Sequence, residues 1–121
     1  MKNWYIAKIV FAIVNNSLKE NKQFDEQLCM IEARDEHEAF FKARMLGVKN
    51  EEEVNGENEK IIFWKFVDVP FLKPVHSFKD GMELYSCIHE CDREEDYEKY
   101  VKRKAIDIQN AFERNTVTLE L

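Results

Sequence analysis

The sequence predicts an α+β domain in which a mainly antiparallel sheet carries its helices on one face. Three observations predict it. Stretches rich in β-branched and aromatic residues indicate strands, and two amphipathic stretches opened by capping residues indicate helices. These elements follow one another in the order ββαββα, with a short C-terminal strand as an optional addition. The length of 121 residues suits one domain over 1–121, with a core at 3–91 and a long helix and tail at 92–121.

The first two strands are expected at residues 3–14 and 24–34. The first is largely apolar but contains Lys8, so the face that carries Lys8 is expected to reach solvent. The second alternates, with Glu26, Leu28 and Met30 on one face. A polar stretch separates the two strands and predicts an antiparallel hairpin with a long loop.

The best-marked helix is expected at residues 36–46. Asp35 is a favourable N-cap, and Glu38 follows at the spacing of a capping box. Gly47 is expected to end the helix in a left-handed conformation. The glutamate-rich residues 49–60 then predict a solvated acidic loop.

The second half of the chain predicts two strands and a long helix. The apolar residues 61–69 form the first strand, which the following prolines Pro70 and Pro74 would end. A connection over 70–81 has its turn at Gly81, and the alternating residues 82–91 form the next strand. Asp92 and Glu95 would cap a helix with an apolar stripe formed by Tyr97, Val101, Ala105, Ile108 and Phe112. The last six residues, 116–121, alternate like a short strand.

Composition excludes several function classes. Three scattered glycines cannot build a phosphate-cradling loop or a dinucleotide fingerprint. The net charge of −6 disfavours nucleic acid and anionic membranes as partners. Three cysteines, an odd number, together with an N-terminal apolar run broken by Lys8 and no apolar stretch of membrane-spanning length, predict a cytoplasmic protein with reduced thiols.

Several segments together resemble a small bacterial family known only as domain of unknown function 4288. The resemblance rests on Trp4-Tyr5-Ile6-Ala7-Lys8, on the helix from Glu36 to Arg44, on Trp64-Lys65-Phe66-Val67-Asp68-Val69, and on the specific run Asp80-Gly81-Met82-Glu83-Leu84-Tyr85-Ser86. It covers about residues 3–88. The resemblance implies a compact bacterial α+β protein and supplies no activity.

The spacing of the cysteines, histidines and serines gives little support for a metal site or a catalytic nucleophile. Cys87, His89 and Cys91 share one face of the expected strand, but the outer two would lie about 13 Å apart, too far for one zinc ion. These cysteines are therefore expected to be small buried thiols. No serine lies in a nucleophile elbow. We expect no catalytic residue, no metal and no cofactor, although enzymatic activity stays open.

A ligand pocket is one alternative that the sequence leaves open. Glu26 matches the family pattern and is expected to form a cross-strand ion pair with Lys8. The pocket would lie near Glu26 and Tyr85, and its candidate binding residues are Lys8, Glu26, Trp64, Glu83 and Tyr85.

A protein-interaction function is the leading expectation, either by self-association or by binding a basic protein. It rests on the missing catalytic motifs, on strands that are apolar on both faces, and on the spare terminal strand. A more specific version is an immunity-like or antitoxin-like protein that neutralises a basic toxin through its acidic loop. The partner-facing residues would be Glu51, Glu52, Glu53 and Glu57.

Overall fold

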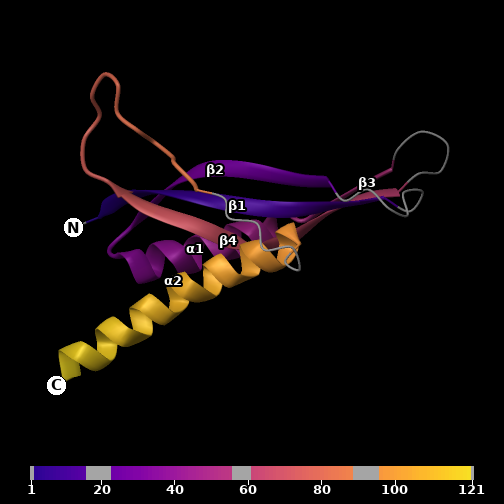
Figure 1. The fold of residues 1–121 in the computed structure, drawn as a ribbon. Helices are drawn as coiled ribbons and strands as arrows, with labels where there is room; N and C mark the ends of the chain where they lie inside the picture. Colours follow the sequence, from indigo (N-terminus) through magenta and orange to yellow (C-terminus); the bar gives the residue numbers. More distant parts are fainter. Residues whose placement is uncertain (1, 16–22, 56–60, 89–95, 121) are drawn as a thin grey trace.

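The structure, a computed structural model, describes residues 2–15, 23–55, 61–88 and 96–120. Its elements are β1 (Asn3–Asn15), β2 (Gln23–Ala33), α1 (Glu36–Lys49), β3 (Glu52–Asn55), β4 (Ile61–Val75) and α2 (Tyr97–Glu120), as drawn in Figure 1. The predicted α+β class with an antiparallel sheet is confirmed. The predicted strand at 61–69 forms as the first part of β4, whereas β3 was not predicted.

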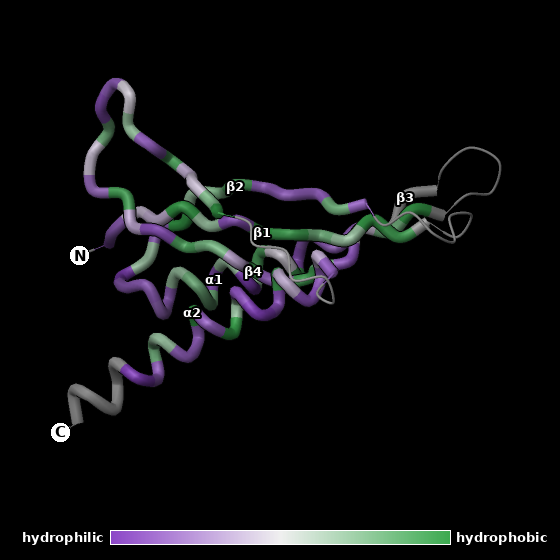
Figure 2. The backbone as a smooth tube through the Cα atoms, viewed as in Figure 1, coloured by the Kyte–Doolittle hydropathy of each residue, from purple (hydrophilic) through white to green (hydrophobic). Residues whose placement is uncertain are grey.

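One antiparallel sheet contains all four strands in the order β2-β1-β4-β3. β1 is central, and Figure 2 shows hydrophobic residues along much of it. Its odd-numbered residues Tyr5 to Phe11 belong to one core cluster, which also contains residues of both helices. We call this side of the sheet the odd face and the opposite side, which carries Lys8 and Val10, the even face.

Helix α1 covers the odd face with the buried residues Ala39, Phe40 and Ala43. Asp35 is its N-cap, as predicted, and accepts a hydrogen bond from the Glu38 amide at 2.8 Å. The Glu38 carboxylate reaches back to the amide of Arg34, one residue before the cap. The predicted stop at Gly47 is wrong, because the helix continues to Lys49. Gly47 instead lies against the Phe66 ring, where a Cβ atom would collide.

The expected acidic loop at 49–60 is also partly wrong, because it contains strand β3. This strand pairs with the start of β4, from Glu52 opposite Trp64 to Asn55 opposite Ile61. Glutamate is a poor strand former, but pairing with an apolar neighbour overrides that weak preference. Residues 56–60 lie outside the described part of the chain.

Strand β4 runs through the two prolines that were expected to end it. Its register with β1 shifts twice between Lys8 and Phe11, so β4 contains two extra residues, one in the pair Val69 and Pro70 and the other at Val67. Pro74 lies opposite Tyr5 on a stretch of β4 that pairs with no second strand among the described residues. Proline is tolerated at such bulges and edges, because no ladder hydrogen bond needs its missing N–H there.

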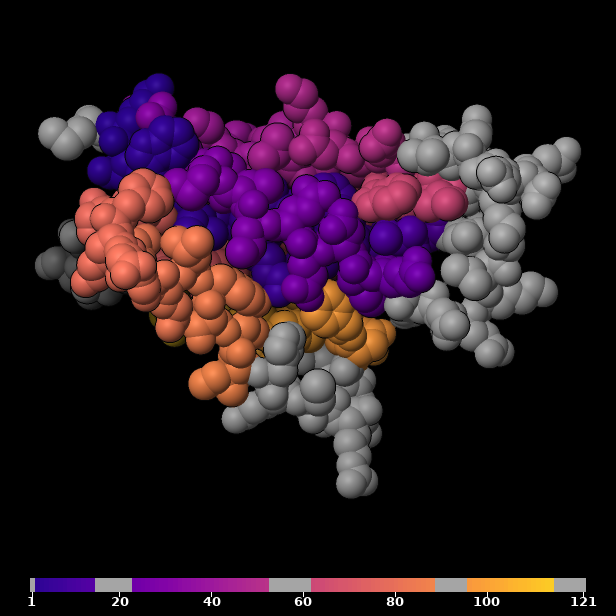
Figure 3. Space-filling model, turned by 90° about the horizontal axis from the view of Figure 1, so that it is seen from above, coloured from indigo at the N-terminus to yellow at the C-terminus, as the bar shows by residue number. Residues whose placement is uncertain are grey.

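The strand predicted at residues 82–91 does not form in residues 82–88, which are the part of that range described by the structure. Residues 76–88, which we call the cover segment, have no regular structure apart from the turn at Asp80 and Gly81, where Gly81 has a φ of 79°. The cover segment folds back over the sheet, and Figure 3 shows it in orange beside the purple β2. Met82 and Tyr85 are partly buried, whereas Leu84 and Ile88 are exposed, so burial in this segment does not follow the alternation of its sequence.

Helix α2 begins at Tyr97, where Asp96 accepts a hydrogen bond from the Lys99 amide at 2.8 Å. The predicted caps Asp92 and Glu95 lie outside the described residues. The helix continues to Glu120, so the strand expected at 116–121 is wrong. The predicted apolar stripe is confirmed, but it serves two clusters: its first turns pack with Val10, and Ala105, Ile108 and Phe112 pack on the odd face. The prediction that the helices pack on one face of the sheet therefore holds for α1 but not for the first turns of α2.

Candidate functional site

Lys8 is the centre of a polar network on the even face. Lys8 is only 4% exposed, so the expectation that this face reaches solvent at Lys8 is wrong. The cover segment excludes water there. The Lys8 ammonium lies 2.8 Å from a Glu26 carboxylate oxygen, which confirms the predicted ion pair, and donates to the Tyr85 hydroxyl at 2.7 Å. Burial opposes the charge of Lys8, but the hydrogen bonds to Glu26 and Tyr85 outweigh it and raise the pKa of Lys8.

Tyr97, in the first turn of α2, also hydrogen-bonds Glu26. Its hydroxyl donates to the second oxygen of that carboxylate. Burial, reinforced by the Glu26 charge, raises the pKa of Tyr97 well above its ordinary value, so the phenol stays protonated. Because Lys8, Glu26 and Tyr97 come from β1, β2 and α2, the network connects three elements that are distant in sequence.

Cys87 lies at the other end of the same network and is exposed, contrary to the expectation of a buried thiol. Its sulfur is 3.1 Å from the Tyr100 hydroxyl, and Tyr85 hydrogen-bonds it as well. The Tyr100 hydrogen bond, together with that of Tyr85 and the positive charges of Lys8 and Lys104, lowers the pKa of the Cys87 thiol. The same contact raises the pKa of Tyr100 to about 12.

A cavity of about 580 Å³ opens beside this thiol, between α2, β4 and the end of the cover segment. We call it the Cys87 cavity. Its polar lining consists of Lys8, Tyr85, Ser86, Cys87, Tyr100, Lys104 and Asp107. Its apolar lining consists of Pro70, Phe71, Leu72, Ile88, Ile108 and Ala111. From Tyr100 to Ala111 it follows α2 for about 16 Å, at 1.5 Å per residue.

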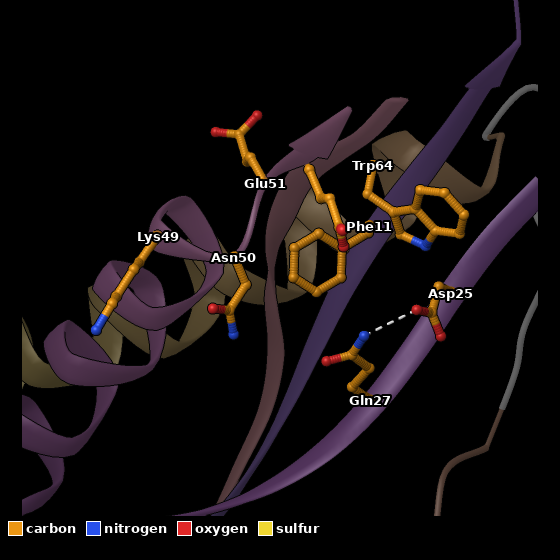
Figure 4. Close-up of a pocket in the computed structure, with 8 residues that line it drawn as sticks. Phe11, Asp25, Gln27, Lys49, Asn50, Glu51 and Trp64 are labelled. Atoms are coloured by element: carbon orange, nitrogen blue, oxygen red, sulfur yellow. Dashed lines mark hydrogen bonds between the residues drawn. The ribbon is translucent and has the colours of Figure 1, made fainter. Parts of the chain in front are cut away.

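A second hollow lies on the odd face, beyond the end of α1, and Figure 4 shows it in close-up. We call it the acidic hollow. It has a volume of about 550 Å³, and its lining residues are Phe11, Asp25, Gln27, Lys49, Asn50, Glu51, Glu52 and Trp64. The Gln27 amide donates to Asp25 at 2.8 Å, the dashed line in the figure. Three carboxylates against one ammonium make this hollow negatively charged.

The predicted binding residues therefore separate into two places. Lys8, Glu26 and Tyr85 come together on the even face. Trp64 lines the acidic hollow on the odd face, together with Glu51 and Glu52. Glu83 is exposed on the cover segment. The side chain of Glu53 and all of Glu57 lie outside the described residues.

Sequence reasoning missed the contribution of α2 to the site. Tyr100 and Lys104 reach the Cys87 cavity because the helix returns beside β4, a contact that no local pattern encodes. One signal was present: Tyr97, Tyr100 and Lys104 recur at helical spacing on the side that carries Val101.

Among the residues that the structure describes, no three His, Cys, Asp or Glu side chains are grouped to hold a metal ion. His89 and Cys91 lie outside this part of the chain. Neither helix is long and apolar enough in its described residues to cross a membrane.

Comparison with known proteins matches the chain to a protein family. The family described as Domain of unknown function (DUF4288) matches residues 4–86. No curated protein and no solved structure matches the chain. The match covers the sheet, α1 and most of the cover segment, and it ends just before Cys87.

Proposed function

Since the chain belongs to the family of domains of unknown function DUF4288, we propose its function from its own geometry: it binds a small organic carboxylate with an apolar body in the Cys87 cavity. The observation that carries this proposal is an elongated cavity that has the Lys104 ammonium near its Cys87 end and that Leu72, Ile108 and Ala111 line farther along, beside Asp107. Ligand sites commonly combine apolar walls with a few convergent polar groups in cavities of this size.

The Lys104 ammonium selects the ligand's head group. It lines the cavity near its Cys87 end, where the hydroxyls of Tyr85 and Tyr100 already donate to the Cys87 sulfur. The Lys8 charge is balanced by Glu26, and Asp107 lies 3.8 Å from Arg103. Lys104 is then the positive charge best placed for an anionic ligand, and charge-assisted hydrogen bonds are the stronger kind.

The apolar lining selects the ligand's body. Leu72, Ile108 and Ala111 lie along the cavity away from Tyr100. An alkyl chain of about eight carbons spans roughly 10 Å, so it fits the distance that α2 provides. Octanoate is therefore a suitable probe, and octylammonium is the matched control with the same body and the opposite charge.

Titration of the isotope-labelled protein with octanoate, followed by NMR, tests the proposal. We expect shifts at Phe71, Tyr85 and Ile108, and at least about tenfold weaker binding of octylammonium. Lys104→Met, which retains the aliphatic stem, should weaken octanoate binding by about tenfold. Ala111→Trp should fill the apolar end and abolish binding.

Phe41→Ser is the control, because it removes an apolar side chain on α1 that is exposed and outside the cavity. If Ala111→Trp binds octanoate like the parent protein while Phe41→Ser does not, the probe occupies α1, and the proposal is wrong.

Self-association is a second candidate function, and exposed apolar residues on α1 favour it. Phe41, Met45 and Val48 are 61%, 51% and 51% exposed and recur at the spacing of one helical stripe. Light scattering after size-exclusion chromatography tests this candidate: a dimer that Phe41→Ser converts to a monomer would support it, and a monomeric parent protein would dismiss it.

A further inference from the structure

Among the described residues no strand lies beside the outer edge of β2, and this edge lacks proline, lysine, a bulge and a short length, four features that commonly protect edge strands. It is 11 residues long, pairs with β1 without a register shift, and contains no proline and no lysine. Natural sheets usually protect their edges with proline, lysine, bulges or very short strands, because an unprotected edge pairs with other chains.

The opposite edge of the same sheet shows that protection. β3 has only four residues. Beyond it, β4 carries Pro70, Pro74, Lys65 and Lys73 and the irregular register with β1. The contrast within one sheet singles out β2 as the edge that is open to a further strand.

The orientation of the β2 backbone can be derived from one contact. Lys42 donates to the main-chain carbonyl of Glu32, so the backbone groups of Glu32 face away from β1. In an antiparallel ladder this orientation repeats every second residue. The N–H and C=O groups of Leu28 and Met30 therefore face the open edge as well, where an added strand would pair with them.

The side chains beside this edge define what an added strand must carry. On the even face, Leu28 and Met30 are 51% and 44% exposed, although most large apolar side chains of the sheet are covered. On the odd face, Asp25 and Gln27 line the acidic hollow, together with Glu51 and Glu52. A strand with apolar residues on one face and lysine or arginine on the other would match both sides.

A second copy of β2 does not meet this requirement. The strand contains Asp25, Glu26 and Glu32 and no basic residue, so two copies side by side would bring like charges together, which destabilises strand pairs. We infer that the β2 edge binds a basic, amphipathic strand of another protein by strand addition, with its basic side chains in the acidic hollow. This surface shares no residue with the Cys87 cavity, so the two proposals stand or fall separately.

A short labelled peptide of alternating lysine and valine is the probe, and its glutamate–valine counterpart is the charge control. Fluorescence anisotropy should show binding of the lysine peptide only, weakening with added salt. Leu28→Pro removes an outward-facing N–H together with the leucine side chain, and Leu28→Lys adds a protecting charge to the edge. Each should weaken peptide binding by at least about tenfold.

Met45→Lys is the matched control, because Met45 is as exposed as Leu28 and lies on α1. It should leave peptide binding unchanged. Leu28→Lys keeps the test valid if Leu28→Pro fails to fold. Equal binding by the parent protein and Leu28→Lys, or equal binding of both peptides, would overturn the inference. So would a dimer of the parent protein that Leu28→Lys dissociates, because the edge would then be occupied by a second copy.

Discussion

Lys8 and Glu26 form a pair whose two members differ in their access to water. The Lys8 side chain is 5% exposed and the Glu26 side chain 43%. Removing the partner of a buried charge is costly, whereas a carboxylate near the surface can regain water. Leaving Lys8 without its partner should therefore cost more stability than leaving Glu26 without its partner.

We predict that Glu26→Gln lowers the free energy of unfolding by about 2 kcal/mol, because it leaves the Lys8 ammonium buried without a countercharge. Lys8→Met should cost less, and Lys8→Met with Glu26→Gln should be more stable than Glu26→Gln alone. Urea denaturation of the four proteins measures these differences. Equal losses for the two single variants would mean that Lys8 is hydrated in solution.

Cys87 provides a pH-dependent prediction. Tyr100 lowers the pKa of the Cys87 thiol by donating a hydrogen bond, so Tyr100→Phe should raise that pKa and slow alkylation by iodoacetamide near neutral pH. By linkage, stability from this thiolate is present above the ordinary thiol pKa and is lost as pH falls through the lowered folded value. Alkylation rates measured against pH, with Cys29 and Cys91 replaced by serine, test the assignment. An unchanged rate profile in Tyr100→Phe would refute it.

In helix α1 the sequence correctly marks Gly47 as a special position but gives the wrong reason for it. Gly47 followed an apolar periodic stretch and therefore predicted a helix end. It is needed because the Phe66 ring occupies the space of a Cβ atom. That ring lies on β4, and no pattern within the helix reports its approach.

Gly47→Ala tests the close approach. Helix propensity alone predicts a gain of about 1 kcal/mol, because glycine is unfavourable inside a helix. We expect instead a loss of about 1–3 kcal/mol, since the Phe66 ring must move and it also packs edge-on against Phe11. Adding Phe66→Leu to Gly47→Ala should recover part of the loss in thermal denaturation. A more stable Gly47→Ala protein would show that the ring shifts freely.

The strands show where sequence reasoning succeeds and where it fails. The alternation in β2 and the apolar run in β1 are local, and both strands formed with Glu26 beside Lys8 as predicted. The end of β4 and the cover segment depend on neighbours. Pro70 and Pro74 are tolerated because that edge is bulged and open. Residues 82–88 alternate in sequence but form no strand, and their burial does not alternate, since the partly buried Met82 and Tyr85 are three residues apart. Half of the candidate site was predictable for the same reason: Lys8 and Tyr85 lie in the family-like segments, whereas Tyr100 and Lys104 arrive on a helix from beyond them.

At the scale of the whole molecule, the family match and the folding unit have different limits. The match ends at residue 86, but α2 supplies the fully buried Val101 and Ala105. Val101 packs in the cluster around Val10, and Ala105 in the cluster around Phe40. Both clusters would be opened to water without this helix.

We therefore predict that a chain ending at residue 96 loses its fixed tertiary structure, because exposed core surface on both faces costs more than the few kcal/mol that separate folded from unfolded small domains. A chain ending at Arg114 is the matched control. It retains Val101, Ala105 and Phe112, the last of the α2 side chains described by the structure that packs against a core cluster. Near-ultraviolet circular dichroism and thermal denaturation distinguish the two chains. If the shorter chain kept a cooperative transition, the sheet with α1 would be the folding unit, and α2 would serve only to complete the Cys87 cavity.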